Sequence, residues 1–333
     1  MSDVNFLDIG RMDELDKCLE PLIKGVFSEG EKIAIKIHFG EPGNPHYISP
    51  EYTKKVVDLL KRLGVKPFLF DSLVNYNSPR AEVDTHIKAV GEHGYTEEAM
   101  GCPIVVSNEF TPIKTDHLTV QVCKPLAEAD GMLVMSHVKG HPCGGFGAAI
   151  KNLGMGGVTK QSKKDQHEGS KPNLDIDKCT GCGTCVEKCP AKAIKLENEK
   201  SVFDYKKCFG CSICQYVCPY DALSPRNAFF DTLLAEAAQA VLKAVKKSYF
   251  VNIINEVAKL CDCFGHPSEI IAKDVGVVFS DDIIAADKAS FDLVVEKEGE
   301  DVFEKHNNKS PMHQIKEGER LGLGSTDYNL IKC

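Results

Sequence analysis

Eight cysteines in two matched runs have the clearest chemistry in this chain. Both runs follow the pattern C-x2-C-x2-C-x3-C-P, over residues 179–190 and again over residues 208–219. This spacing is typical of the ligands of two [4Fe-4S] clusters, where each run gives three thiolates to one cluster and its fourth to the other. The predicted ligand sets are Cys179, Cys182, Cys185 and Cys218 for one cluster, and Cys208, Cys211, Cys214 and Cys189 for the other.

Structural zinc is the main alternative for paired C-x2-C motifs, but zinc needs only four ligands in two pairs. A third cysteine at the same spacing and a fourth before proline, both repeated, exceed that need. A framework of disulfides is disfavoured, because the chain has 333 residues and disulfide-rich scaffolds are small secreted domains. Residues 172–226 resemble a bacterial-type two-cluster ferredoxin, and this resemblance implies one-electron transfer.

The glycine-rich segment 137–157 is a second candidate for chemistry. Its seven glycines from residue 140 onward let the backbone approach a ligand closely, and its lysines add positive charge. Such a segment can hold an anionic substrate or a cofactor phosphate. No dinucleotide or P-loop motif is present, so a nicotinamide nucleotide is poorly supported, and packing of the glycines against the sheet stays open as an alternative. A flavin has no motif in its favour either. The candidate residues are Lys139 and Lys151 for charge, and Gly144, Gly145, Gly147, Gly154 and Gly156 for cofactor binding.

Cys261 and Cys263 form a third candidate group, close to His266. A C-x-C pair can bind a soft or borderline metal, hold one edge of a further cluster, or act as a redox thiol pair. Buried, redox-inactive thiols are the alternative. His38, His137 and His141 lie at or near other predicted strand ends and could deliver protons, since imidazole titrates near neutral pH.

Alternating strand-like and helix-like segments must position these residues. Alternating or continuous apolar residues predict strands at 32–38, 65–70, 131–138, 250–254 and 274–279. Helices are expected at 50–63 and 229–247, and another after an N-cap at Ser280. This order favours an α/β fold, a mixed or parallel sheet with covering helices. We expect one α/β domain from residues 1–171 and 227–333, with an α+β dicluster ferredoxin-like module inserted at 172–226; two independent α/β lobes remain an alternative.

Composition and net charge limit the classes of partner that we expect for this chain. The net charge of −8 argues against binding a phosphate backbone, and Lys160, Lys163 and Lys164 are interpreted as a solvated loop. No apolar stretch approaches the ~20 residues of a membrane span, and the first ten residues carry no secretory signal. Fifteen cysteines without such a signal predict a reducing, cytoplasmic setting. We therefore expect neither nucleic acid nor a membrane as partner.

Four motifs extend the resemblance over nearly the whole chain: KIHFGE at 36–41, SHVKGH at 136–141, GFGAAIKNLGMG at 145–156 and CDCF at 261–264. Together they resemble the domain-of-unknown-function 362 family, in its form with an inserted ferredoxin module. The resemblance implies an α/β domain joined to two four-iron clusters in a cytoplasmic protein. It does not identify a substrate. Its candidate site positions are His38, His137, Lys139, His141, Lys151, Cys261 and Cys263.

Three functions are compatible with these features. The first is an iron-sulfur oxidoreductase that relays electrons to a substrate, metal or cofactor site on the α/β domain, with a redox protein as partner and a small anionic substrate. The second is a non-catalytic electron-transfer subunit of a larger redox complex. The third is a metallocentre maturation factor that uses Cys261, Cys263 and Cys333 to carry a metal or cluster. For Cys333 both a mobile thiol and an ordinary solvent-exposed terminus stay open.

Overall fold

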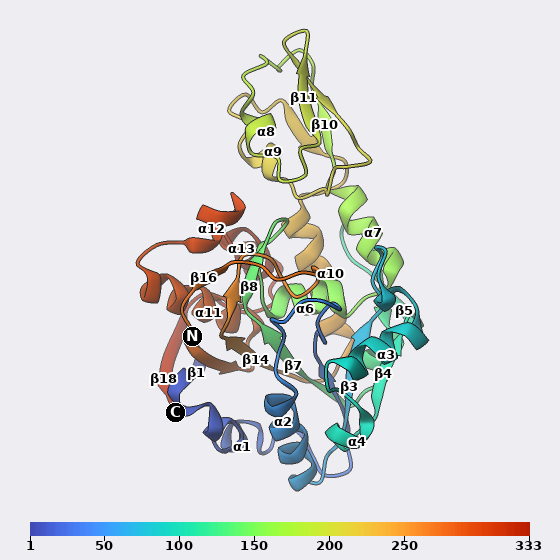
Figure 1. The fold of residues 1–333 in the computed structure, drawn as a ribbon, viewed down its shortest axis with the longest axis vertical. Helices are drawn as coiled ribbons and strands as arrows, with labels where there is room; N and C mark the ends of the chain where they lie inside the picture. Colours follow the sequence, from blue (N-terminus) through green and yellow to red (C-terminus); the bar gives the residue numbers. More distant parts are fainter.

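A single eight-stranded sheet organises the computed structural model, which describes residues 1–333 (Figure 1). The strand order is β18-β1-β17-β14-β7-β2-β3-β4. The five strands from β14 to β4 run parallel, whereas β17 is antiparallel to both of its neighbours, β1 and β14. The predicted α/β class with a mixed sheet is confirmed. The strands are β1 (Ser2–Asp8), β2 (Lys32–Lys36), β3 (Lys66–Ser72), β4 (Ile104–Ser107), β7 (Gly131–His137), β14 (Ser248–Ile254), β17 (Gly276–Ser280) and β18 (Tyr328–Lys332).

Helices cover both faces of this sheet and bury two separate hydrophobic cores. The central strand β7 is buried along its whole length, as expected for a parallel strand with helices on both sides. One core includes side chains of α1 and α2, and the other includes side chains of α6, α10 and α11. The helices of the body are α1 (Leu15–Ile23), α2 (Pro50–Arg62), α3 (Val83–Glu92), α4 (Glu97–Met100), α5 (Lys124–Ala127), α6 (Ala149–Gly156), α7 (Lys160–Gly169), α10 (Phe230–Ala244), α11 (Ile283–Glu298), α12 (Val302–Asn307) and α13 (Met312–Arg320).

Residues 172–226 leave the body between α7 and α10 and stand at the top of the view in Figure 1. They form two small antiparallel pairs, β10 with β13 and β11 with β12, and bury a small core of their own. We call this segment the cysteine module. Its elements are β10 (Pro172–Leu174), α8 (Thr184–Glu187), β11 (Ile194–Glu197), β12 (Lys200–Phe203), α9 (Ile213–Tyr216) and β13 (Leu223–Pro225).

Three short hairpins complete the fold. One of them, β8 with β9, lies inside the glycine-rich segment and leads into α6. This segment therefore consists mainly of a hairpin and a helix. No helix is both long and apolar enough to cross a membrane. The hairpins are β5 (Phe110–Lys114) with β6 (Thr119–Cys123), β8 (Lys139–His141) with β9 (Gly145–Gly147), and β15 (Val257–Ala258) with β16 (Ile270–Ala272).

Two local predictions are wrong, and one alternative for Cys333 is excluded. The N-cap of α11 is Asp282, whose carboxylate accepts the Ile284 and Ala285 N–H groups, while Ser280 ends β17. Lys163 belongs to no solvated loop, because it is buried in α7 and its ammonium donates to the Ser72 hydroxyl at 2.8 Å. Cys333 is not a mobile thiol, since a disulfide joins it to Cys18.

Candidate functional site

The site lies at the carboxyl ends of the parallel strands, where open α/β sheets place ligands. His137 ends β7, His38 follows β2, and the C-x-C pair follows β15. With Lys151 of α6 these residues line a small cavity of about 60 Å³. The structure therefore brings together most of the predicted catalytic residues and the predicted thiol pair.

Of the five predicted cofactor-binding glycines, only Gly147 and Gly156 line this cavity. The other three lie where a side chain would collide with the protein. A Cβ on Gly145 would lie 2.4 Å from the Lys309 carbonyl oxygen, and one on Gly154 would lie 2.5 Å from that of Leu234. One on Gly144 would lie 3.0 Å from both Gln314 and Phe146. Close packing, the alternative that the sequence left open, fits Gly144, Gly145 and Gly154.

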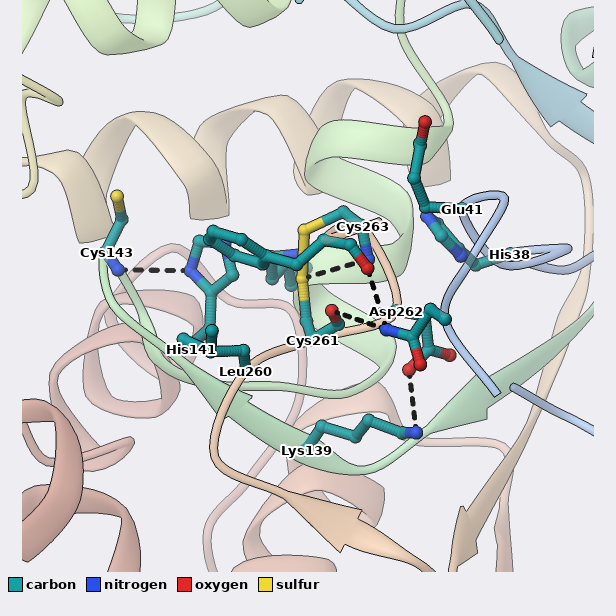
Figure 2. The surroundings of a disulfide bond; sticks show 12 residues. His38, Glu41, Lys139, His141, Cys143, Leu260, Cys261, Asp262 and Cys263 are labelled. Atoms are coloured by element: carbon teal, nitrogen blue, oxygen red, sulfur yellow. Dashed lines mark hydrogen bonds and ion pairs between the residues drawn. A yellow bond between two sulfur atoms is a disulfide. The ribbon is translucent and has the colours of Figure 1, made fainter. Parts of the chain in front are cut away.

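The C-x-C pair, which lines the cavity, and His141, which lies beside it, form the chemical centre of the site (Figure 2). A disulfide joins Cys261 and Cys263, and a ring nitrogen of His141 and the two sulfurs lie within 4.8 Å of one another. Backbone N–H groups of Cys143 and Gly144 donate to His141 Nδ1 at 3.1 and 3.2 Å. The other ring nitrogen of His141, Nε2, makes no hydrogen bond within the protein and can therefore interact with a group in the site.

Asp262, between the two cysteines, organises the other side of the site and was not among the predicted residues. Its carboxylate lies 2.8 Å from Lys139 Nζ and 3.2 Å from His137 Nδ1. Burial alone would raise the pKa of Asp262, but the Lys139 ammonium and His137 hold it well below its usual range. Lys139 also donates to the His46 carbonyl, and His137 Nε2 contacts the Asn255 carbonyl at 2.8 Å. Lys139 and His137 thus hold Asp262 in place, and neither has a free polar atom for a ligand.

Replacing Asp262 by asparagine should destabilise the protein by about 3–5 kcal/mol, because Lys139 would stay buried without its counter-charge. The folded-state pKa of Asp262 is depressed, so its stabilisation is present above the unfolded value of ~3.9 and is lost as pH falls towards the folded value. Urea unfolding of Asp262→Asn at pH 7 and at pH 3 checks both effects. A Lys139→Met/Asp262→Asn double variant is the control and should recover much of the loss.

A buried network of charges that the sequence did not predict lies behind His38. Arg80 contacts Asp71 at 2.7 Å and Glu41 at 3.2 Å, and Lys36 contacts Asp71 at 3.1 Å. Burial and the Arg80 guanidinium lower the pKa of His38 well below its ordinary value. Its two ring nitrogens face the Gly40 N–H and Arg80. The predicted role of His38 in proton delivery therefore has no support in its surroundings.

Lys151 is the cation of the cavity that has no carboxylate within ion-pair distance. Its ammonium lies 3.7 Å from Cys261 Sγ, the one polar partner it has. Burial lowers the pKa of Lys151 to about 8. At neutral pH the cavity consequently presents a positive charge beside the sulfurs, suited to a thiolate or a small anion.

Lys151→Met should make the protein more stable at pH 7 by about 1–3 kcal/mol, because a poorly compensated buried charge is removed. Between the native pKa near 8 and the unfolded value near 10.4, the unfolded chain binds more protons. Stability of the unmodified protein should hence rise with pH across this window, and the variant should lack that rise. Denaturant titrations from pH 7 to pH 10 measure it. Lys164→Met, at an exposed position of α7, is the matched control and should change neither quantity.

In the cysteine module the eight cysteines separate into two groups of four, each facing its own cavity. All eight are free thiols. The groups are the two predicted ligand sets: Cys179, Cys182, Cys185 and Cys218 line one cavity, and Cys189, Cys208, Cys211 and Cys214 line the other. We call them the outer set and the inner set.

The inner set is the one that contacts the body. The loop that carries Cys211 packs against the main core, and the Gly210 carbonyl accepts the Ser170 hydroxyl. Lys309, 2% exposed, forms a 2.6 Å ion pair with Asp231 and donates to the Cys211 carbonyl at 2.8 Å. The same ammonium donates to the Cys143 carbonyl at 2.7 Å. Lys309 thereby ties the inner set to the residue that hydrogen-bonds His141.

Comparison with known proteins decides the family. The family described as "Domain of unknown function (DUF362)" matches residues 33–292, which is more than half of the chain. The chain belongs to the DUF362 family. This confirms the resemblance inferred from the four motifs.

Two curated proteins match short segments of this DUF362 protein. Pyruvate synthase subunit PorD of Methanothermobacter marburgensis is 63% identical over 27 residues, which are 8% of this chain and 33% of that protein. A probable ferredoxin of Methanosarcina thermophila is 54% identical over 26 residues, 8% of this chain and 45% of that protein. The chain thus spans less than half the length of either relative.

Among solved structures, a protein from Thermotoga maritima aligns with a TM-score of 0.44 at 8% identity, over 93% of this chain and 59% of that one. The lactate racemase apoprotein from Thermoanaerobacterium thermosaccharolyticum aligns with a TM-score of 0.39 at 12% identity, over 77% of this chain and 51% of that one.

Proposed function

We propose that this DUF362 protein is an iron-sulfur oxidoreductase, in which two [4Fe-4S] clusters exchange electrons with the site around Cys261 and Cys263. The observation that carries the proposal is the grouping of eight free cysteines into two sets of four, one of which contacts the body beside that site. The short likeness to a ferredoxin supports the iron-sulfur part. The proposed arrangement has residues 172–226 as a unit inserted into one α/β domain.

The residues of both sets fit such clusters. Each cavity offers four thiols and mostly apolar walls, the donor set that an iron-sulfur cluster requires. The Ala193 N–H points at Cys189 Sγ at 3.3 Å, and the Ala222 N–H points at Cys218 Sγ at 3.4 Å. Such N–H groups stabilise thiolate ligands and help to set the potential of a bound cluster. When bound, the clusters would supply one-electron chemistry, and the outer and inner sets would hold one each.

The body supplies a short bonded connection from the inner set to the site. It runs from the Cys211 carbonyl to the Lys309 ammonium, from there to the Cys143 carbonyl, and from the Cys143 N–H to His141. His141 lies against the two sulfurs of the C-x-C pair. Each contact in this series is a hydrogen bond of 3.1 Å or less up to the imidazole. This series supports the proposal that the inner set is the one that serves the site.

A non-catalytic electron-transfer subunit is the second candidate. The likeness to PorD, by its name a subunit of pyruvate synthase, favours a redox protein as partner. The outer end of the module would be the contact surface, because Cys182 is exposed there and Ile176, Leu196 and Tyr220 expose 43–50% of their surface. A maturation factor would need three free thiols here, but Cys333 is not one of them because it forms a disulfide with Cys18.

Anaerobic purification followed by iron, sulfide, zinc and flavin analysis tests the proposal. Two clusters predict about eight irons and eight sulfides per chain, and an electron paramagnetic resonance signal on reduction. Zinc in place of iron, or fewer than four irons after reconstitution, would contradict it. An eight-iron protein whose site remains chemically unchanged when the clusters are reduced would favour the subunit role instead.

A further inference from the structure

We propose that Cys261 and Cys263 are a redox-active pair that cycles between a disulfide and a dithiol, and not the ligands of a third metal centre. The inference rests on the proposed function, because it identifies what receives the electrons. It concerns a choice that the sequence left open, since a C-x-C pair can serve either purpose.

The hydrogen bonds of His141 disfavour a metal. A histidine that binds a metal through one ring nitrogen usually donates the proton of the other to a carboxylate, carbonyl or water. Here Nδ1 faces two donors, the N–H groups of Cys143 and Gly144. An imidazole that accepts at Nδ1 carries its proton at Nε2, so Nε2 is a donor and has no lone pair for a metal. The tautomer that these two hydrogen bonds favour therefore leaves His141 with a proton, and not a lone pair, at its other ring nitrogen.

The charges around the pair favour a thiolate. Lys151 Nζ lies 3.7 Å from Cys261 Sγ, and the Cys263 N–H points at the same sulfur at 3.4 Å. A cation and hydrogen-bond donors beside a cysteine stabilise its thiolate and make it the reactive sulfur of a pair. Asp262 does not oppose this, because its carboxylate forms an ion pair with the Lys139 ammonium and also contacts His137. Cys261 is accordingly the sulfur that becomes the thiolate.

The reaction balances with a one-electron donor of the reduced ferredoxin class. Two electrons, delivered one at a time, break the Cys261–Cys263 sulfur bond, and one proton goes to Cys263 as the thiol forms. Cys261 remains a thiolate beside the Lys151 ammonium. Re-formation of the disulfide returns two electrons and the proton to an acceptor. Because Cys263 is only partly buried and both sulfurs line the cavity, the acceptor we expect is a small two-electron oxidant such as a low-molecular-weight disulfide.

Counting reducing equivalents tests this. The reconstituted protein is titrated anaerobically with the methyl viologen radical, and cysteines are then alkylated and located by mass spectrometry. The complete chain should take up about two more electrons than a Cys261→Ser/Cys263→Ser variant, because a disulfide is a two-electron couple. Alkylation at Cys261 and Cys263 should appear only after reduction. A Cys102→Ser/Cys123→Ser variant, which removes two other buried free thiols, is the matched control and should titrate like the unmodified protein.

Four results test this inference separately from the proposed function. Alkylation of Cys261 and Cys263 before any reduction would contradict the redox pair. So would about one zinc per chain that disappears in the double serine variant. Neither result would contradict the two clusters. Failure to load iron, with the pair still opened by a phosphine reductant, would overturn the proposed function alone. Equal electron uptake by the complete chain and the double serine variant would overturn the inference.

Discussion

Cys214→Ala should halve the iron content, from about eight to about four per chain, and stop the reduction of the Cys261–Cys263 pair. The variant removes one thiolate of the inner set, which is the set that contacts the body through Cys211 and Lys309. The outer set keeps its four cysteines and should still hold a reducible cluster. Iron analysis, electron paramagnetic resonance and alkylation of the pair after reduction by methyl viologen radical measure the three quantities.

Cys182→Ala is the matched variant on the outer set. It should lose the same amount of iron, because it also breaks one set of four. A small reductant that reaches the inner set directly should nevertheless still open the pair, whereas reduction by a protein donor should slow strongly. If Cys182→Ala and Cys214→Ala behave alike with both reductants, the division into outer and inner roles is wrong.

Lys309→Met should remove the bonded connection between the cysteine module and the site, while the clusters and the Cys261–Cys263 pair both remain. Lys309 is buried and joins Asp231, Cys211 and Cys143. Its loss leaves the Asp231 carboxylate buried and unpaired, which should cost about 3–5 kcal/mol of unfolding free energy. Both clusters should load and reduce, but opening of the Cys261–Cys263 pair should slow by about 10- to 100-fold, a range typical of lost positioning.

A double variant distinguishes the two effects of Lys309. Adding Asp231→Asn removes the unpaired charge, so stability should largely recover while the slow opening of the pair persists. Lys171→Met is the control, because Lys171 is also a buried lysine that contacts the module, at the Tyr205 carbonyl, and lies outside the connection through Cys143. Stopped-flow reduction followed by quenching and alkylation gives the rate. Recovery of both stability and rate in the double variant would show that Lys309 acts on folding alone.

Asp262 and Arg80 show where sequence patterns stop being informative about this site. Asp262 lies inside the CDCF motif, but that motif drew attention to its two cysteines, and Arg80 lies in no motif; the roles of both come from partners that are not their neighbours in the chain. Asp262 pairs with Lys139, and Arg80 pairs with Asp71 and Glu41. A pattern within a few residues cannot report such pairs, because only folding brings the partners together. The same reason explains why Lys163 was misinterpreted as a solvated residue.

The sequence by itself determined the two groups of cysteines, the α/β sheet, and the strand ends at which the site lies. These are local properties: ligand spacing, apolar periodicity and the positions where strands end are contained in short segments. Only the tertiary structure decided which cysteine set contacts the body, which glycines pack against neighbouring chain, and which lysine is free to act. Lys139 and Lys151 look alike in the sequence, but one is compensated by Asp262 and the other lies beside the Cys261 sulfur with no carboxylate partner. That difference depends on the distances between segments that only the folded chain brings into contact, and those distances fix the charge that each side chain presents to the site.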